Sequence, residues 1–326
     1  MKSFVFYFSV VAFVAFISVA CRSDDFAPPV APVSEEVRLE TSAGTLYGTL
    51  KLPAAEGPFP VALIIAGSGP TDRNGNSPAG VNSNYLLMMA DSLARAGIAS
   101  LRYDKRGIAA SQAAAGEDES KLRFDDYVQD AVQWIEQLRS DERLSSIAII
   151  GHSEGSLIGM LAAQTTNPAA FVSLAGAARP ADSLILDQLS TQPDEIRREV
   201  ASILNELRQG RTVDAVNPML LSLFRPSVQP YLISWIRHHP SDIINQLGQP
   251  VLVVQGTTDL QVPEAAGKQL AAAQSNAQLV IVEDMNHVLK QAPADQAANF
   301  ATYSDPALPL ATGLMPAIIG FLKQHP

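Results

Sequence analysis

The sequence predicts an α/β fold in which a mostly parallel central sheet carries helices on both faces. Short, continuously apolar runs rich in β-branched residues recur along the chain, as in strands that are buried on both faces. Helical patterns separate these runs, and such alternation is typical of parallel sheets. A β-hairpin over residues 37–52 precedes them. The expected buried strands are residues 61–66, 98–103, 147–150, 171–175, 251–254 and 278–282.

Residues 1–20 are predicted to be a secretory signal peptide outside the fold. Lys2 supplies a positive start, and an almost unbroken apolar run follows to residue 20. Its length is close to the lower limit of ~17 residues for a membrane span, so an uncleaved anchor is an alternative. Cys21 stands directly after the run, where bacterial lipoproteins carry their lipidated cysteine, although Ser18 departs from the usual pattern. We therefore expect an exported protein of the periplasm or cell envelope that is anchored to the membrane at Cys21.

The composition restricts the partners. Cys21 is the only cysteine, which excludes an internal disulfide. A net charge of −10 with scattered Lys and Arg argues against nucleic-acid and anionic-membrane partners. The chain shows no repeat, no CxxC or HExxH motif and no phosphate-binding glycine loop. No metal or organic cofactor is implied, and the expected partner is a small-molecule ester or related acyl substrate.

The remaining segments follow in chain order. Proline-rich residues 21–36 are expected to form a solvated tether. Turn-forming residues dominate 67–76, and an acidic Ala/Gly-rich loop is expected at 109–119. The predicted helices are residues 84–96, ended by Gly97, 124–139, 264–273 and 315–323.

The alternation of strands and helices stops at residues 179–247. This region has a mostly helical pattern, and prolines break its apolar stretch at 219–236 into short pieces. Because strand 251–254 resumes the alternation, we expect 179–247 to be a helical cap inserted into a core of 37–178 and 248–326. A second independent domain is the alternative.

A Gly-His-Ser-Glu-Gly turn links strand 147–150 to an Ala-rich helical segment. A strand that reverses sharply into a helix leaves Ser153 in a strained conformation, and side chains at Gly151 or Gly155 would clash across the turn. The nearby helix N-terminus favours developing negative charge. Ser153 is therefore the predicted nucleophile.

A serine nucleophile needs a general base and an acid partner for that base. The working groups of a parallel sheet lie at the carboxyl ends of its strands, and His287 follows strand 278–282 in a loop. His152 lies inside the turn, where its side chain should point away from that of Ser153. The other histidines lie in the insertion or at the chain end: His238, His239 and His325. We therefore predict His287 as the base.

Three aspartates follow predicted strands. Asp259 lies just after strand 251–254 and gives the chain order Ser, Asp, His. Asp284 is three residues from His287 and could contact its ring, and Asp104 precedes Lys105 and Arg106, which favours a structural ion pair. Asp259 ranks first as the acid, followed by Asp284 and then Asp104.

Two converging backbone N–H groups are needed to stabilise an oxyanion at the carbonyl. The N–H of Glu154, the first residue of the helix after the turn, is one candidate. The other is expected from the loop after strand 61–66, from Ser68 or Gly69, because glycines there let the backbone approach the substrate.

Together these motifs resemble those of α/β-hydrolases, in the bacterial serine hydrolase group with serine aminopeptidase-like and carboxylesterase-like members. The resemblance runs from about residue 37 to the C-terminus, and the motifs fix no substrate. The resemblance implies an α/β-hydrolase fold with a helical cap and a triad of Ser153, Asp259 and His287. Ser156 is a departure, since a glycine or alanine often follows the turn in relatives. The motifs are residues 67–73 (GSGPTDR), 101–107 (LRYDKRG), 151–155 (GHSEG), 253–259 (VVQGTTD) and 285–287 (MNH).

The sequence thus predicts a serine esterase that acts through an acyl-enzyme on small to medium acyl substrates. A serine aminopeptidase is the alternative within enzymes, and it would need an acidic group such as Asp194 or Glu195 to hold the substrate ammonium. A lipoprotein that binds a ligand on a hydrolase scaffold without turnover is the alternative of another class.

Overall fold

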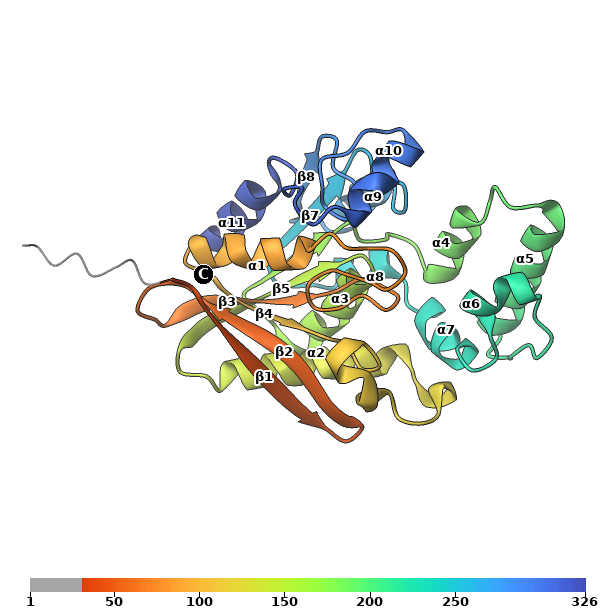
Figure 1. Cartoon of the computed structure of the whole chain (residues 1–326), viewed down its shortest axis with the longest axis horizontal. Helices are drawn as coiled ribbons and strands as arrows, with labels where there is room; N and C mark the ends of the chain where they lie inside the picture. Colours follow the sequence, from red (N-terminus) through yellow and green to blue (C-terminus); the bar gives the residue numbers. More distant parts are fainter. Residues whose placement is uncertain (1–30) are drawn as a thin grey trace, which may run out of the picture. The chain divides into compact units, whose positions relative to one another are not determined.

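An eight-stranded sheet forms the centre of residues 31–326, the part of the chain that the computed structural model describes. The strand order is β1-β2-β4-β3-β5-β6-β7-β8 (Figure 1). β2 pairs antiparallel with β1 and β4, and every other neighbouring pair is parallel. The predicted mostly parallel sheet is therefore confirmed. The strands are β1 (Val33–Thr41), β2 (Gly44–Leu52), β3 (Phe59–Ile65), β4 (Ala99–Tyr103), β5 (Leu144–His152), β6 (Ala170–Leu174), β7 (Val251–Gly256) and β8 (Gln278–Val282).

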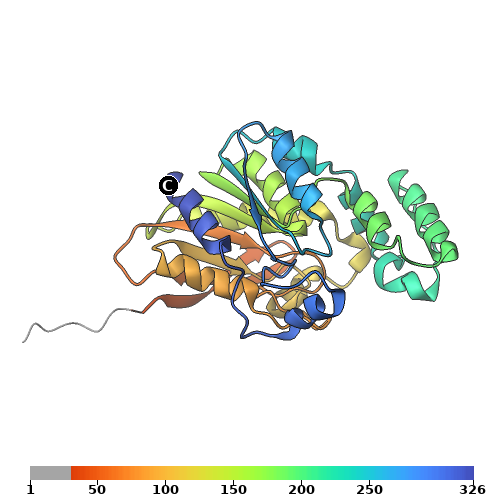
Figure 2. The same ribbon diagram turned by 90° about the horizontal axis from the view of Figure 1, so that it is seen from above.

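Helices cover both faces of the sheet. Figure 1 and Figure 2 show α1 and α11 on one face and α2, α3 and α9 on the other. The buried side chains of α1 and α11 join one apolar cluster, and those of α2, α3 and α9 join a second cluster. These helices are α1 (Tyr85–Arg95), α2 (Phe124–Arg139), α3 (Glu154–Thr166), α9 (Glu264–Ala273) and α11 (Leu314–Gln324). The short helices outside the insertion are η1 (Ala109–Ala115), η2 (Glu119–Lys121), α10 (Gln296–Ala301) and η4 (Thr302–Ser304).

The apolar strand sequences supply both clusters because successive side chains of a strand point to opposite faces. Ile147 and Ile149 of β5 belong to the cluster beneath α2 and α3. Ala148 and Ile150 belong to the cluster beneath α1 and α11. A strand buried on both sides must be apolar at every position, which explains the continuous apolar runs of the sequence.

Residues 179–247, called the insertion below, lie between β6 and β7 and are mostly helical. Their buried side chains join the same apolar cluster as α2 and α3. Trp235 stacks on Phe124 of α2 with ring centroids 5.8 Å apart, and the Ser234 hydroxyl accepts a 2.8 Å hydrogen bond from the Phe124 N–H. The helices are α4 (Ala181–Gln188), α5 (Asp194–Arg208), η3 (Pro218–Leu220), α6 (Leu221–Phe224), α7 (Gln229–Ile236) and α8 (Pro240–Asn245).

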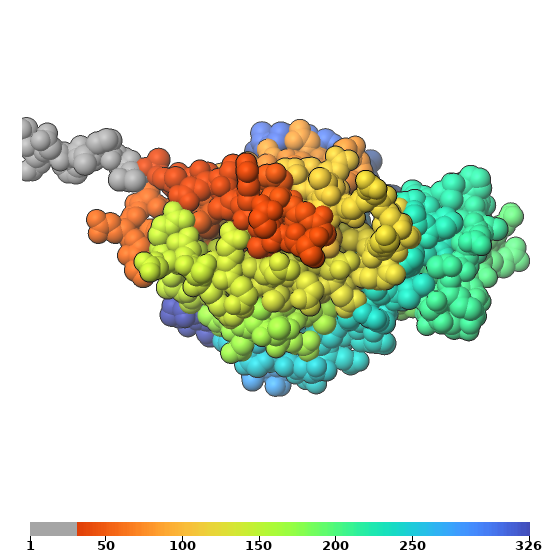
Figure 3. Space-filling model, turned by 90° about the horizontal axis from the view of Figure 1, so that it is seen from below, coloured from red at the N-terminus to blue at the C-terminus, as the bar shows by residue number. Residues whose placement is uncertain are grey.

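The insertion also contacts the segment after β4. Arg225 forms an ion pair with Glu119, and Figure 3 shows the teal insertion against the yellow segment that contains Glu119. Prolines break the apolar stretch at 219–236, as expected from the sequence. None of the helices within residues 31–326 has the length and apolar character needed to cross a membrane.

The start of the fold differs from the sequence prediction. The predicted signal peptide, Cys21 and residues 22–30 of the tether lie outside the described residues. β1 begins at Val33, so residues 33–36 form part of a strand and not of a tether. They pair with residues 49–52 of β2. β1 is an edge strand with mostly exposed side chains, which explains why its sequence is polar enough to resemble a linker.

The predicted loop at 109–119 also differs, because it contains the 3₁₀ helix η1. Ser111 accepts a 2.9 Å hydrogen bond from the N–H of Tyr47 in β2. Ala114 is buried, and a Cβ at Gly44 would lie 3.2 Å from its Cα atom. The small alanines of this segment therefore permit close packing against the hairpin, which composition alone does not reveal.

Replacing Trp134 with alanine should lower the free energy of unfolding by about 3–5 kcal/mol, since a large aromatic core side chain is lost. Trp134 of α2 is fully buried against Tyr103 of β4, with ring centroids 5.7 Å apart. Urea denaturation measures the change. Phe300→Ala is the control, because Phe300 is 41% exposed and its loss should cost far less. Equal losses in the two variants would contradict the packing of α2 on the sheet.

Candidate active site

Ser153 lies at the sharp turn between β5 and α3. Its backbone has φ 55° and ψ −118°, outside the regions that side-chain-bearing residues usually occupy. A Cβ at Gly151 would lie 2.3 Å from the Gly155 carbonyl oxygen, and a Cβ at Gly155 would lie 2.3 Å from the Ile65 carbonyl oxygen. Both glycines are therefore required where α3 crosses β3 and β5. The turn has the geometry expected from the sequence.

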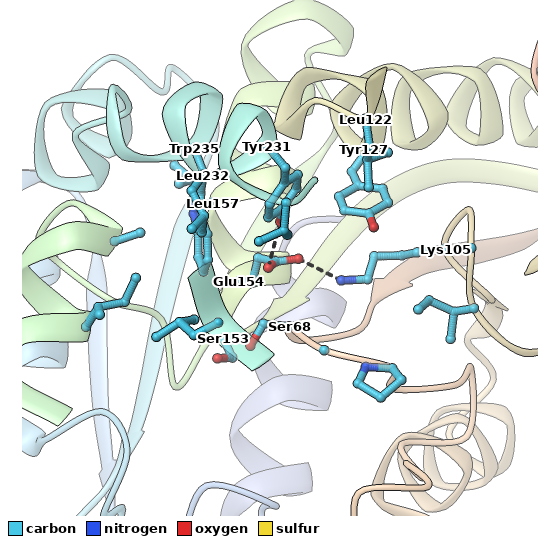
Figure 4. Close-up of a pocket in the computed structure, with 18 of the residues that line it drawn as sticks. Ser68, Lys105, Leu122, Tyr127, Ser153, Glu154, Leu157, Tyr231, Leu232 and Trp235 are labelled. Carbon is cyan, nitrogen blue, oxygen red and sulfur yellow. Dashed lines mark hydrogen bonds and ion pairs between the residues drawn. The ribbon is translucent and has the colours of Figure 1, made fainter. Parts of the chain in front are cut away.

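A cavity of about 760 Å³ opens beside Ser153. It is called the active-site cavity below. His287, Glu154, Ser68 and Gly69 line it together with Ser153, so the candidate nucleophile, base and oxyanion-hole residues share one cavity. Figure 4 shows Ser153, Ser68 and Glu154 in this cavity. The insertion supplies much of the apolar wall through Leu184, Ile185, Leu223, Val228, Leu232 and Trp235.

His287 and Asp259 are paired inside the fold. His287 Nδ1 lies 2.8 Å from Asp259 Oδ2, and both side chains are buried. The N–H groups of Gln261 and Val262 donate to Asp259 Oδ1 over 2.8 and 2.9 Å. Burial raises the pKa of Asp259, but the charge and hydrogen bond of His287 and the two N–H groups outweigh it, so the net pKa lies below its ordinary value.

A catalytic triad also needs a contact between the serine and the base. In the described structure, Ser153 Oγ and His287 Nε2 do not form a hydrogen bond. With Nδ1 donating to Asp259, Nε2 is the ring nitrogen that remains to accept a proton. Such a contact is often long before a substrate binds. Asp259 and His287 are therefore hydrogen-bonded to each other, and the serine hydroxyl beside them is not hydrogen-bonded to the base.

The other candidate acids are held elsewhere. Asp284 is exposed in a turn with φ 52°, and its carboxylate contacts Gln291. Asp104 accepts hydrogen bonds from the backbone and side chain of Arg73 and from the N–H of Ala110. The expected ion pair of Asp104 is present, although its partner comes from the loop after β3 and not from the adjacent basic residues.

His152 is buried beneath His287. Its Nε2 lies 2.8 Å from the His287 carbonyl oxygen, and its Nδ1 lies 3.1 Å from the Tyr85 hydroxyl. Since a carbonyl can only accept, Nε2 carries the proton and Nδ1 accepts from Tyr85. Burial, followed by the proximity of His287, lowers the pKa of His152 to about 3. A neutral His152 thus supports the loop that carries His287, a role that sequence reasoning missed.

The remaining histidines do not line the active-site cavity. His238 packs on Phe124 with ring centroids 5.5 Å apart, and His325 packs on Phe321. His239 is the N-cap residue of α8. Within residues 31–326, no group of three or more His, Cys, Asp or Glu side chains is arranged to hold a metal ion.

The candidate oxyanion donors lie on two elements that meet at Ser153. Glu154 is the first residue of α3, and Ser68 and Gly69 follow β3. None of their three N–H groups donates a hydrogen bond to another described residue. Gly67 packs against the turn that carries Ser153, since a Cβ there would lie 3.2 Å from Ser153 Cβ.

Sequence reasoning also missed two residues that hold the side chain of Glu154. Lys105 Nζ lies 2.7 Å from Glu154 Oε1, and the Tyr231 hydroxyl lies 2.9 Å from Glu154 Oε2 (Figure 4). Lys105 lies in a motif that the sequence singled out, but neither spacing nor composition pairs it with Glu154.

Comparison with known proteins identifies the family. A family model described as serine aminopeptidase, S33, matches residues 80–243, which is half of the chain. The chain belongs to the S33 serine aminopeptidase family. A second model, described as TAP-like protein, matches residues 234–309 of this S33-family chain. The two matches together include the turn at Ser153, the insertion and the segments that carry Asp259 and His287.

Esterase EstD of Thermotoga maritima is 27% identical to this S33-family chain over 267 residues. The match covers 80% of this chain and 61% of EstD, so the chain spans less than two thirds of that relative.

Solved structures show the α/β-hydrolase fold of this S33-family chain. Est1E from Butyrivibrio proteoclasticus with bound ferulic acid has a TM-score of 0.58 at 18% identity, covering 89% of this chain and 98% of Est1E. A thermophilic esterase from Thermogutta terrifontis has a TM-score of 0.55 at 17% identity, covering 90% of this chain and 100% of that one. The predicted α/β-hydrolase fold is therefore confirmed.

Replacing His152 with glutamine should make stability less sensitive to acid. As the pH falls below about 6.5, the unfolded state binds a proton at His152 that the folded state rejects down to about pH 3, so folding is destabilised. Between pH 6 and 4 the free energy of unfolding should fall about 1.4 kcal/mol per pH unit faster in the wild type than in His152→Gln.

Urea denaturation at pH 6, 5 and 4 measures both slopes. All other titrating groups contribute to the pH dependence of unfolding in both proteins. The difference between the two slopes therefore reports on His152 alone. Equal slopes would show that His152 binds its proton in the folded state, against the neutral form inferred from its contacts.

Proposed function

We propose that the protein is a carboxylic ester hydrolase in which Ser153 is the nucleophile, His287 the general base and Asp259 the acid partner. The observation that carries the proposal is the buried His287–Asp259 hydrogen bond of 2.8 Å in a cavity that Ser153 also lines. Membership of the S33 family and the similarity to EstD support it.

The proposed reaction begins when Ser153 Oγ attacks the ester carbonyl carbon as its proton moves to His287 Nε2. Asp259 stabilises the resulting imidazolium and holds its tautomer. The N–H groups of Glu154 and of Ser68 or Gly69 stabilise the oxyanion. His287 then gives its proton to the leaving alkoxide, and an acyl-enzyme remains. Water, deprotonated by His287, attacks this ester and releases the acid and free Ser153.

An apolar acyl group suits the active-site cavity. Its volume of about 760 Å³ lies within the range of small-molecule sites, and the insertion contributes mainly aliphatic and aromatic side chains to its wall. We therefore propose small to medium acyl chains.

The aminopeptidase alternative has less support. Asp194 and Glu195 begin α5 and do not line the cavity. Three other acidic residues line it: Glu117, Glu119 and Glu154. Glu119 and Glu154 are engaged by the basic partners Arg225 and Lys105 respectively, whereas Glu117 is exposed. A substrate ammonium would therefore have to displace an existing ion pair at Glu119 or Glu154, which leaves Glu117 as the acidic group that this alternative would need.

Export and lipid attachment at Cys21 are also part of the proposal. They rest on the sequence of residues 1–21 alone.

A fluorophosphonate probe should label the purified wild-type protein and not Ser153→Ala, since the probe forms an Oγ–P bond with an activated serine as fluoride leaves. The wild type should also hydrolyse p-nitrophenyl butyrate faster than aminoacyl-p-nitroanilides, which tests ester against peptide chemistry. Gel fluorescence and absorbance measure the two readouts. A folded wild type that neither labels nor hydrolyses these substrates would refute the proposed function.

Asp259→Asn should lower kcat by about 10⁴-fold, because the amide can no longer stabilise the imidazolium or hold its tautomer. Asp284→Asn is the matched control, since Asp284 is exposed and its carboxylate forms no hydrogen bond or ion pair with His287 in the described structure, and its kcat should stay near that of the wild type. Steady-state kinetics with p-nitrophenyl butyrate compare the two. The opposite ranking would assign the acid role to Asp284.

A further inference from the structure

Lys105 is buried next to the proposed oxyanion hole. Its side chain is 2% exposed, and its ammonium donates two 2.7 Å hydrogen bonds, one to the Gly67 carbonyl oxygen and one to Glu154 Oε1. The ammonium also lies 4.9 Å from the centre of the Tyr127 ring, within the range of a cation–π contact. Three different partners therefore fix the position of this charge.

Glu154 holds Lys105 in place. Its side chain is 4% exposed, and its second carboxylate oxygen accepts the 2.9 Å hydrogen bond of the Tyr231 hydroxyl from α7. Removing one member of a buried ion pair leaves an uncompensated charge, so each of these contacts depends on the others. Lys105, Glu154 and Tyr231 therefore form one connected set of buried side chains.

The contact between Lys105 and Gly67 bears on the oxyanion hole through one peptide unit. The Gly67 carbonyl and the Ser68 N–H belong to the same planar group, which is trans, so they point in opposite directions. Holding the carbonyl against Lys105 therefore fixes the direction of the Ser68 N–H. That N–H has no partner among the described residues, and Ser68 lines the cavity with Ser153.

The loop needs such a contact because its own backbone restrains it little. Gly67 precedes this peptide unit, and its ψ angle sets the direction of the unit. Because glycine lacks a Cβ atom, its backbone is less restricted than that of other residues, so this peptide unit could rotate at low cost. A rotated unit would turn the N–H away from the substrate carbonyl.

We infer that Lys105 is a positioning residue for the oxyanion hole. It holds the Gly67–Ser68 peptide so that the Ser68 N–H faces the developing oxyanion, and Glu154 holds Lys105 in turn. The Tyr231 hydroxyl ties this arrangement to the insertion. The inference selects Ser68 over Gly69 as the second donor, and it rests on the proposed function.

The kinetic consequence is specific. An oxyanion donor acts on charge that develops in the transition state, so misorienting it should lower kcat and leave KM nearly unchanged. Losing one donor typically costs about 10²–10³-fold in kcat. A residue needed only for folding would instead lower the fraction of active protein and its thermal stability.

The test is Lys105→Met, assayed with p-nitrophenyl butyrate and with an alkyl trifluoromethyl ketone. The ketone forms a hemiketal with Ser153 whose oxygen occupies the oxyanion hole. We expect kcat to fall about 10²–10³-fold with KM changed less than about threefold, and the inhibition constant of the ketone to rise in parallel with the loss of kcat/KM. Tyr231→Phe should show a smaller change in the same direction.

Lys51→Met is the matched control, because Lys51 of β2 is also mostly buried and paired, with Asp91 of α1, but does not line the cavity. It should keep the wild-type kcat and inhibition constant. A folded Lys105→Met with wild-type kcat, or with a shifted pH profile of kcat/KM, would overturn the inference.

The double variant Lys105→Met/Glu154→Gln separates positioning from stability. It removes both buried charges, so its melting temperature should recover relative to Lys105→Met while kcat stays low. Recovery of kcat together with stability would show a structural role only and would overturn the inference. Failure of the proposed function gives a different result, since the wild type would then show neither labelling by the fluorophosphonate probe nor turnover.

Discussion

The close crossing of α3 over β3 and β5 is the constraint on which the rest of the site depends. Gly155 lies so near the end of β3 that no side chain fits between them, and Gly151 lies equally near α3. This crossing forces the positive φ of Ser153 and aims the N-terminus of α3 at the same point. It also brings the loop after β3 beside the serine, because β3 and β5 are neighbours in the sheet. The positions of Ser153 and of the proposed oxyanion-hole loop are therefore consequences of one packing contact.

The main features of the fold and the candidate site could be predicted from sequence because they follow from periodicity and topology. Parallel strands place their carboxyl ends on one edge, so Asp259 and His287 had to lie near Ser153 once the strands were recognised. The contacts of His152 with His287 and of Lys105 with Glu154 could not be predicted. They join residues 135 and 49 positions apart, and tertiary packing alone selects them. The first residues of β1 escaped prediction for a different reason, since an edge strand exposed to solvent lacks the apolar alternation of a core strand.

The charged motif at residues 101–107 has a common physical purpose. Every charged side chain in it binds another segment near the carboxyl end of the sheet, although the chain as a whole is acidic and its other ion pairs are mostly exposed. The contacts are Arg102 with Asn74, Asp104 with Arg73, Lys105 with Glu154 and Arg106 with Asp130. Three of these contacts are largely buried ion pairs, which add little net stability but make any arrangement that separates the partners costly. The motif therefore contributes more to the relative positions of the segments around the site than to the free energy of unfolding.

The position of β7 and β8 at one edge of the sheet has a consequence for the order in which the protein is made. Ser153 and its loop belong to strands that are synthesised first, whereas Asp259 and His287 follow the two strands that are synthesised last. A growing chain that has completed the insertion already holds its proposed nucleophile but lacks both groups that would activate it. Hydrolytic competence would thus arise only near the end of synthesis, and a chain cut short before residue 259 would be inert even if its first six strands assembled.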